Sequence, residues 1–265
     1  MPELVATRDR RFRGTSAGGR AADDTPSQRS ATGWAAMSTP IRTVAILPAY
    51  QLEASIAAIV ERTKPFVDAV IVVADGSRDA TGRAARDAGA IVPEPSAARG
   101  KGHAVIRGIE AARALNPEIV VLLDSDGQHL PEEIPGMLAP IREGRADVVS
   151  GSRMLGTLRT STINRFGNYG LRLISLVICG RWLTDTETGF RAFRAQALFD
   201  MPLESQRYEI ESEIMLRSIF RRLRIVEVPI TVPFAVPGVT VRDGLAVGWY
   251  KISKGLAMRT GRIQP

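Results

Sequence analysis

From Ile41 onward, short apolar runs alternate with segments in which apolar residues recur at helical spacing. Strands are predicted at Thr43–Leu47, Ala69–Val73, Ala90–Val92, Ile119–Leu123 and Asp147–Gly151. Helices are predicted at Ser55–Thr63, from Ser77 or Asp79 through Ala88, at Gly102–Leu115 and from Pro131 onward. Repeated strand–helix units of this length are typical of a largely parallel sheet. The sequence therefore predicts a Rossmann-like α/β fold with a mostly parallel central sheet and helices on both faces.

The C-terminal third adds a helix at Glu209–Phe220 and a strand at Leu223–Val232 that Pro229 interrupts. Near the end, four apolar residues recur at helical spacing, with three cations largely off that stripe: Leu245, Trp249, Ile252 and Leu256, against Lys251, Lys254 and Arg259. Residues 242–265 are therefore predicted to form a basic amphipathic helix. Two placements fit it: the apolar stripe packs on the protein's own core, or it lies on an anionic membrane surface.

The first 36 residues differ from the rest of the chain. They are rich in Arg, Gly, Ser, Thr and Ala, and they lack both apolar periodicity and the apolar core of a secretion signal. We expect residues 1–36 to be a disordered tail and residues 37–241 to form the main domain. Met37 precedes the first predicted strand and is a second candidate for the translation start. An abundant native protein beginning at Met1 in mass spectrometry would reject it.

Charge and composition narrow the range of partners. The 265 residues carry a formal net charge of +7, which favours anionic partners such as nucleotide phosphates or a lipid surface. The single Cys179 excludes an internal disulfide framework and a cysteine-rich zinc site. A basic cluster lacks interleaved aromatic residues and is interpreted as a solvated face, so no nucleic-acid partner is expected. Its members are Arg217, Arg221, Arg222 and Arg224.

No apolar run reaches the roughly 20 residues that a transmembrane helix needs. We therefore expect a cytoplasmic protein that is not an integral membrane protein. Peripheral contact with the inner face of the membrane stays open as an alternative, since the C-terminal helix suits it.

The buried strand at Ile119–Leu123 ends in Asp124-Ser125-Asp126-Gly127-Gln128. Side chains alternate along a strand, so Asp124 and Asp126 are expected on one side, at the sheet edge where open α/β folds bind ligands. Two carboxylates followed by the amide oxygen of Gln128 are hard-oxygen ligands suited to Mg²⁺ or Mn²⁺, which would in turn hold a diphosphate. The alternative is a solvated, Asp-rich turn after a core strand.

The glycines do not fit a dehydrogenase. A dinucleotide-binding fold has Gly-x-Gly-x-x-Gly after its first strand, where this chain has Pro48-Ala49-Tyr50-Gln51, and no P-loop sequence is present either. Glycines gather instead at Gly100-Lys101-Gly102 before a helix, where a lysine and exposed amides can meet an anion. A flexible surface turn is the alternative for this segment.

Six segments follow one another along the chain: Leu47–Tyr50, Val73–Ser77, Gly100–Gly102, Asp124–His129, Gly151–Arg153 and Thr184–Arg191. In this order they resemble the family 2 glycosyltransferases of GT-A fold. The closest resemblance is to the dolichol-phosphate or polyprenyl-phosphate mannosyl- and glucosyltransferases, and it covers roughly Val44 to Val232.

The resemblance implies a metal-dependent, inverting transfer of a sugar from a nucleotide-sugar donor. It assigns the divalent cation, Mg²⁺ or Mn²⁺, to Asp124, Asp126 and Gln128. The substrate-binding candidates are Pro48, Tyr50, Asp75, Lys101, Asp124, Ser125, Arg153 and Arg165. The two arginines resemble residues that grip phosphates, and a surface salt bridge is the alternative for each.

The catalytic candidates Asp185 and Glu187 bracket Thr186. A hydroxyl acceptor requires a carboxylate base, for which Asp185 is preferred, whereas a lipid phosphate is already an anion and needs positioning more than deprotonation. The alternative is that Asp185 caps a helix or pairs with Arg191. His129 follows the metal segment and is interpreted as structural rather than as a ligand.

Two positions depart from the family pattern. The family usually reads Pro-Ala-Tyr-Asn-Glu and Asp-Asp-Gly-Ser, where this chain has Gln51-Leu52 and Ala74-Asp75. Each change removes an acid near the nucleoside, so we expect relaxed or altered nucleobase choice. Polyprenyl phosphate is the favoured acceptor. A small-molecule or secondary-metabolite acceptor, and a catalytically weak nucleotide-binding protein, are the alternatives.

Overall fold

A computed structural model of the chain describes residues 42–156, 170, 173–178, 180–233 and 241–265. The chain divides into two units, Met1–Thr39 and Pro40–Pro265, and every element below belongs to the second. The predicted tail at residues 1–36, the alternative start at Met37 and the predicted phosphate ligand Arg165 lie outside the described residues.

Strands and helices alternate through most of the second unit. They are β1 (Thr43–Pro48), α1 (Ile56–Thr63), η2 (Lys64–Phe66), β2 (Ala69–Val73), α2 (Thr81–Asp87), α3 (Lys101–Arg113), β3 (Ile119–Leu122), η3 (Pro131–Glu133), α4 (Ile134–Arg142), β4 (Val148–Ser152), β5 (Arg191–Arg194), α6 (Ala195–Phe199), α7 (Glu209–Phe220), β6 (Ile225–Pro229) and α8 (Val241–Arg259). β2 and α7 have their predicted bounds. The strand predicted at Ala90–Val92 is reduced to a single bridge between Ile71 and Ile91.

Six strands form one sheet in the order β2-β1-β3-β5-β4-β6. Only β5 runs antiparallel to its neighbours among these strands, whereas the other pairings are parallel. The predicted mostly parallel sheet is therefore confirmed. Because β1, β2, β3 and β4 run in the same direction, their carboxyl ends meet along one edge, where β5 begins opposite Leu122 and Ser150.

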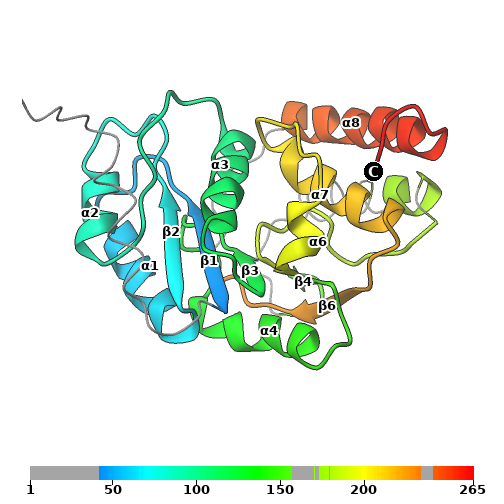
Figure 1. Ribbon diagram of the computed structural model, residues 1–265. Helices are drawn as coiled ribbons and strands as arrows, with labels where there is room; N and C mark the ends of the chain where they lie inside the picture. The colour runs from blue at the N-terminus through cyan, green and yellow to red at the C-terminus, as the bar shows by residue number, and fades with distance from the viewer. Residues whose placement is uncertain (1–41, 157–169, 171–172, 179, 234–240) are drawn as a thin grey trace, which may run out of the picture. The chain divides into compact units, whose positions relative to one another are not determined.

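Helices cover both faces of the sheet, as predicted (Figure 1). On one face, α1, α2 and α4 pack in an apolar cluster that includes Val60 and Met137. On the other, α3, α6 and α7 pack in a second cluster that includes Ile109 and Ile214. Alternate side chains of each strand enter the two clusters, as strand geometry requires. The sheet is thus rigidly held from both sides.

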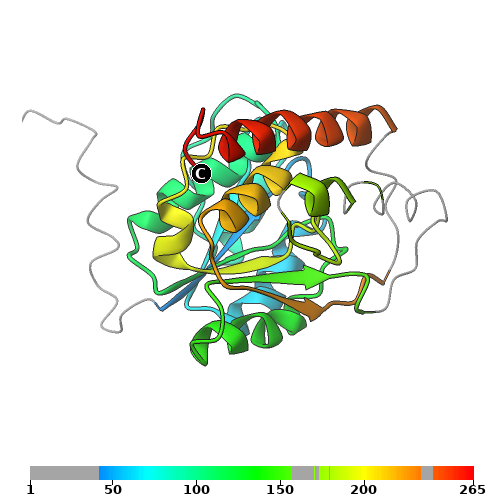
Figure 2. The same ribbon diagram turned by 90° about the vertical axis from the view of Figure 1, so that its right-hand side faces the viewer.

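The C-terminal helix α8 packs on α7 (Figure 2). Three of the four residues of the predicted apolar stripe do not face inward: Leu245, Trp249 and Leu256 are 72%, 72% and 48% exposed, whereas Ile252 is half-buried. Lys251, expected on the polar side, is 1% exposed. The placement of the stripe on the protein's own core is therefore wrong. The inward face can bury a lysine because Gly255 lets α8 approach Ile178 closely. The ammonium group of Lys251 then pairs with the carboxylate of Glu187.

The predicted solvated arginine face is wrong for Arg217, which is 2% exposed. Its guanidinium donates to Glu213 Oε1 at 2.9 and 2.7 Å and to the Gln264 carbonyl at 2.8 Å. Arg221 donates to the Pro265 carbonyl at 3.1 Å. These two arginines anchor residues 264 and 265 against α7, and these bonds together with Glu213 explain why the charged Arg217 is buried there.

Gln51 adopts a left-handed backbone conformation with φ of 53° after β1. Asparagine enters this region more readily than glutamine does. We expect Gln51→Asn to raise the free energy of unfolding by about 0.5 kcal/mol, since strain of this kind is of order 1 kcal/mol or more. Urea denaturation measures this, and the same change at Gln196 in α6 is expected to lower stability slightly. A Gln51→Asn protein no more stable than the parent would contradict the strain argument.

Candidate active site

A cavity of about 410 Å³ opens where β1, β2 and β3 end, beside the first turn of α3. It is lined by six of the predicted substrate-binding residues: Pro48, Tyr50, Asp75, Lys101, Asp124 and Ser125. The hydroxyl of Ser125 donates to the Pro48 carbonyl, which ties the segment after β3 to the end of β1. The fold therefore gathers four of the predicted motifs into one site.

Lys101 begins α3 and reaches the carboxylate at the end of β3. Its Nζ lies 2.6 Å from Asp124 Oδ1 and 2.8 Å from Glu211 Oε1, while His129 Nε2 lies 3.7 Å from the second Asp124 oxygen. Burial opposes ionisation of Asp124, but Lys101 and His129 outweigh it and hold the pKa of Asp124 well below its usual range. Asp124 is therefore a carboxylate at neutral pH.

Gly100 and Gly102 serve close backbone packing. Gly100 has a φ of 108°, and a Cβ at Gly102 would lie 2.2 Å from the Ser205 carbonyl oxygen. The backbone N–H of His103 donates to the Gln206 carbonyl at 3.1 Å. The segment is thus a tightly packed helix start that aims Lys101 at the site, which contradicts the alternative of a flexible surface turn.

Asp126 and Gln128 form a carboxylate–amide pair next to Asp124. The backbone N–H and the Nε2 of Gln128 donate to the two Asp126 oxygens, each at 2.9 Å. Among the described residues, no three His, Cys, Asp or Glu side chains are grouped so as to hold a metal. Two carboxylates still fit Mg²⁺ or Mn²⁺, because such ions are commonly held by one or two carboxylates together with substrate phosphates.

Asp75 lines the same cavity and is 7% exposed. Its Oδ1 accepts hydrogen bonds from Arg107 and from the Ser96 N–H, the latter at 3.2 Å. Its Oδ2 lies 3.3 Å from His103 Nδ1, yet neither atom has a hydrogen-bond partner within the part of the chain that is described. A buried carboxylate oxygen with no donor is costly unless something supplies one.

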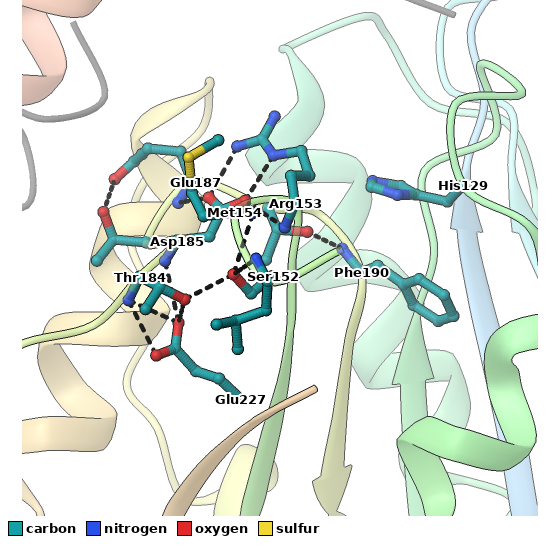
Figure 3. A network of polar contacts seen from close by, with 12 residues as sticks. His129, Ser152, Arg153, Met154, Thr184, Asp185, Glu187, Phe190 and Glu227 are labelled. Atoms are coloured by element: carbon teal, nitrogen blue, oxygen red, sulfur yellow. Dashed lines mark hydrogen bonds and ion pairs between the residues drawn. The ribbon is translucent and has the colours of Figure 1, made fainter. Parts of the chain in front are cut away.

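Arg153 and Asp185 form an ion pair in which Asp185 is buried and Arg153 is half-buried (Figure 3). Arg153 Nε and Nη2 donate to the two Asp185 oxygens at 2.6 and 2.8 Å, and its backbone N–H donates at 3.1 Å. Burial opposes the charge on Asp185, but Arg153 outweighs it and lowers the pKa of Asp185. The alternative pairing of Asp185 with Arg191 is wrong, because Arg191 contacts Glu211 at 2.5 Å instead.

Glu227 in β6 supports this pair and was not predicted from the sequence. Its Oε1 accepts from the N–H and hydroxyl of Thr184, each at 2.8 Å, and from the Asp185 N–H at 3.0 Å (Figure 3). The available signal was a charged residue between two valines of a strand. Glu227 thereby fixes the loop that carries Asp185.

The second catalytic candidate, Glu187, has partners that carry no signal in the sequence. Its Oε1 lies 2.5 Å from Lys251 Nζ, and Ser212 Oγ donates to its Oε2 at 2.9 Å. Burial disfavours the charge on Arg153, yet Asp185, Glu187 and Asp124 together raise its pKa. Three carboxylates therefore favour the charge on this guanidinium, and Asp185 contacts it directly.

Residues 44–200 match the family model described as "Glycosyl transferase family 2". The chain belongs to this family. It is accordingly a nucleotide-sugar-dependent glycosyltransferase, as the resemblance implied.

Relatives of this glycosyltransferase carry names from lipid-linked sugar chemistry. An undecaprenyl-phosphate mannosyltransferase from Micrococcus luteus is 32% identical, over 83% of this chain and 100% of the relative. A UDP-N-acetylglucosamine–dolichyl-phosphate N-acetylglucosaminyltransferase from Methanococcus voltae is 28% identical, over 82% of this chain and 96% of the relative.

Solved structures confirm the GT-A fold of the glycosyltransferase. Glucosyl-3-phosphoglycerate synthase from Mycobacterium tuberculosis, in complex with Mn²⁺, UDP-glucose and phosphoglyceric acid, has a TM-score of 0.64 and 24% sequence identity. The similarity covers 83% of this chain and 80% of that one.

Proposed function

We propose that this glycosyltransferase moves a hexosyl group from a nucleotide sugar to a polyprenyl phosphate at a membrane surface. The supporting observation is that the segment carrying Asp185 and Glu187 packs against the cavity residue Asp124, because a Cβ at Gly189 would lie 2.1 Å from Asp124 Oδ2. The two relatives above, whose names specify a polyprenyl-phosphate acceptor, support the lipid in place of a small molecule.

The nucleotide of the donor occupies the cavity in this proposal. Asp75, which lines the cavity, faces the base or the ribose. Asp124, Asp126 and Gln128 hold Mg²⁺ or Mn²⁺. When bound, the cation neutralises charge that develops on the departing diphosphate. Lys101, beside Asp124, adds a further positive charge on that side.

The acceptor phosphate lies near Arg153 in this proposal. Two of the guanidinium nitrogens, Nε and Nη2, bond to Asp185, and the proposal assigns the third, Nη1, to a phosphate oxygen. A lowered pKa makes Asp185 a weak base, which suits an acceptor that needs no deprotonation. Asp185 and Glu187 then act by orienting the acceptor.

The exposed stripe of α8 is the proposed membrane contact. Among the described residues, no helix combines the length and the apolar character needed to cross a bilayer. Leu245, Trp249 and Leu256 nevertheless expose a large apolar surface, with Arg259 and Arg262 exposed nearby. Tryptophan beside basic residues suits the anionic inner leaflet, which attracts positive charge.

Replacing Leu245 and Trp249 together with serine is expected to weaken binding to phosphatidylglycerol-containing vesicles by about 100-fold. Each side chain contributes about 1.5–3 kcal/mol when it leaves water, and 1.4 kcal/mol is tenfold in affinity. Co-sedimentation measures the loss. Ala246→Ser on the same exposed face is the control, and neutral vesicles should bind the parent protein weakly. Unchanged binding by the double variant would remove α8 from the membrane contact.

A donor screen by mass spectrometry tests the function. Nucleotide hexoses with different bases are incubated with Mn²⁺, Mg²⁺ or EDTA, with and without polyprenyl phosphate. We expect a hexosyl-phosphoryl-polyprenol that forms only with a divalent cation. Transfer to soluble acceptors alone would favour the small-molecule alternative, and nucleotide binding without any transfer would favour a binding protein.

Calorimetry with UDP, GDP, dTDP and CDP tests the choice of base. We expect relaxed or altered selectivity, because Ala74 replaces the acid that relatives usually carry before Asp75. Ordinary tight selectivity for UDP or GDP would contradict this.

A further inference from the structure

Lys251 is a buried lysine that reaches from α8 into the catalytic loop. Its Nζ lies 2.5 Å from Glu187 Oε1, 2.7 Å from Thr186 Oγ1 and 3.2 Å from Ser175 Oγ. The side chain is 1% exposed. A buried ammonium group is expensive unless it is paired and hydrogen-bonded, so this one is retained at a specific carboxylate.

The inward face of α8 is shaped to deliver this side chain. Gly248 and Gly255 are buried on either side of Lys251, and a Cβ at Gly255 would lie 2.4 Å from Ile178 Cγ2. The helix axis therefore comes close to the segment around residues 173–178. Val247 and Met258 are buried on the same face and seal it with apolar surface.

Glu187 is held from several directions by these contacts. Ser212 Oγ donates to both of its oxygens, at 3.1 and 2.9 Å, and Thr186 Oγ1 donates to Oε1 at 3.0 Å. Lys251 supplies the positive charge in direct contact. Without it, the Glu187 carboxylate would keep two hydroxyl donors but lose the ion pair that fixes its position.

We propose that Lys251 is a positioning residue for the acceptor side of the reaction. It holds Glu187 and Thr186, and thereby the loop that presents Asp185 to Arg153. The role rests on the proposed function, in which this loop borders the acceptor. The polar contacts of Lys251 within the described part of the chain are to Glu187, Thr186 and Ser175, and none of these residues lines the donor cavity. The loss of Lys251 therefore acts on the acceptor and on turnover while the donor still binds.

Lys251→Met is expected to lower kcat/KM for the acceptor by about 100-fold, the effect of a roughly 1 Å misplacement of a reacting group. Affinity for the nucleotide with Mn²⁺, measured by calorimetry, is expected to stay within about twofold. Lys251→Arg, which keeps the charge, is expected to recover a part of the lost kcat/KM. The double variant Lys251→Met/Glu187→Gln removes the unpaired carboxylate and is expected to recover thermal stability but not activity.

Two controls separate positioning from general loosening. Lys254→Met removes a neighbouring lysine of α8 that pairs with the exposed Glu204, and it should leave kinetics unchanged. Arg217→Met breaks a different buried ion pair, with Glu213 on α7, and it should lower stability without the selective loss in acceptor kcat/KM.

A Lys251→Met protein that loses donor and acceptor binding equally, or that keeps full activity, would overturn the proposal. The ratio of variant to parent is measured on whichever acceptor the parent protein uses. If the polyprenyl phosphate assignment is wrong, the parent protein will not transfer sugar to that lipid. If the role of Lys251 is wrong, the variant-to-parent ratio of kcat/KM for the acceptor will stay near one.

Discussion

The Asp124→Asn variant is expected to lose about 10³-fold in turnover while remaining folded. A cation at a leaving diphosphate contributes several kcal/mol, and each 1.36 kcal/mol is about tenfold in rate. The amide keeps the shape of the side chain but removes the charge that, in our proposal, holds the metal. Steady-state transfer assays and calorimetric Mn²⁺ binding in the presence of nucleotide measure the two losses together.

Asp147→Asn is the matched control for Asp124→Asn. Arg224 lowers the pKa of Asp147 to about 2, and this pair lies at the opposite end of β4 from the site. Turnover is expected to stay unchanged. The lowered pKa means that Asp147 stabilises the fold above its unfolded pKa near 3.9 and loses this effect as the pH falls toward 2. An Asp124→Asn protein that binds Mn²⁺ and turns over normally would refute the metal site.

The strands that frame the site could be predicted because their apolar runs are continuous. β1, β2 and β3 are buried on both faces, so each strand can be recognised as a continuous apolar run without an alternating pattern. Polar motifs at the ends of these strands mark the edge of the sheet that carries the site. β5 was harder to place. It begins with Arg191, whose charge is acceptable inside the sheet because Glu211 on α7 meets it, and a partner so distant leaves no local pattern.

The C-terminal helix also contains a buried charge whose partner is distant in the sequence. Periodicity located α8 and left two placements of its apolar stripe open, but it did not reveal that the face carrying Lys251 is the one turned to the core. Lys251 is buried because Glu187, 64 positions earlier, compensates its charge. Ion pairs between distant segments are set by tertiary structure, so sequence patterns alone give the elements and the motifs but not the partners of each charge.

The Asp185→Asn variant is expected to lower the free energy of unfolding by about 3 kcal/mol at pH 7, since it leaves Arg153 without its partner. The estimate is at the lower end for a buried pair because Arg153 is 22% exposed. Because the pKa of Asp185 is lowered, its contribution is present above the ordinary pKa of about 3.9 and is lost as pH falls below it. The difference in free energy of unfolding between the parent protein and Asp185→Asn, measured by denaturation, should therefore be smaller at pH 3 than at pH 7.

Arg62→Met is the control, because Arg62 makes a similar two-pronged contact with Glu132 on the surface. Exposed pairs of this kind contribute about 0–1 kcal/mol. If Arg62→Met lowered the free energy of unfolding as much as Asp185→Asn does, burial would not explain the large effect expected for the Arg153–Asp185 pair.

The double variant Arg153→Met/Asp185→Asn separates the structural role of the pair from its chemical role. Removing both charges leaves no unpaired ion, so we expect about 1–3 kcal/mol of stability to return relative to the sum of the single variants. Turnover, expected to fall about 100-fold in Asp185→Asn through misplacement of Arg153, should not return, because the proposed phosphate contact is lost with the guanidinium. Recovered turnover would make the pair purely structural. A stable but inactive Asp185→Asn protein would instead identify Asp185 as a catalytic base, and with it a hydroxyl acceptor.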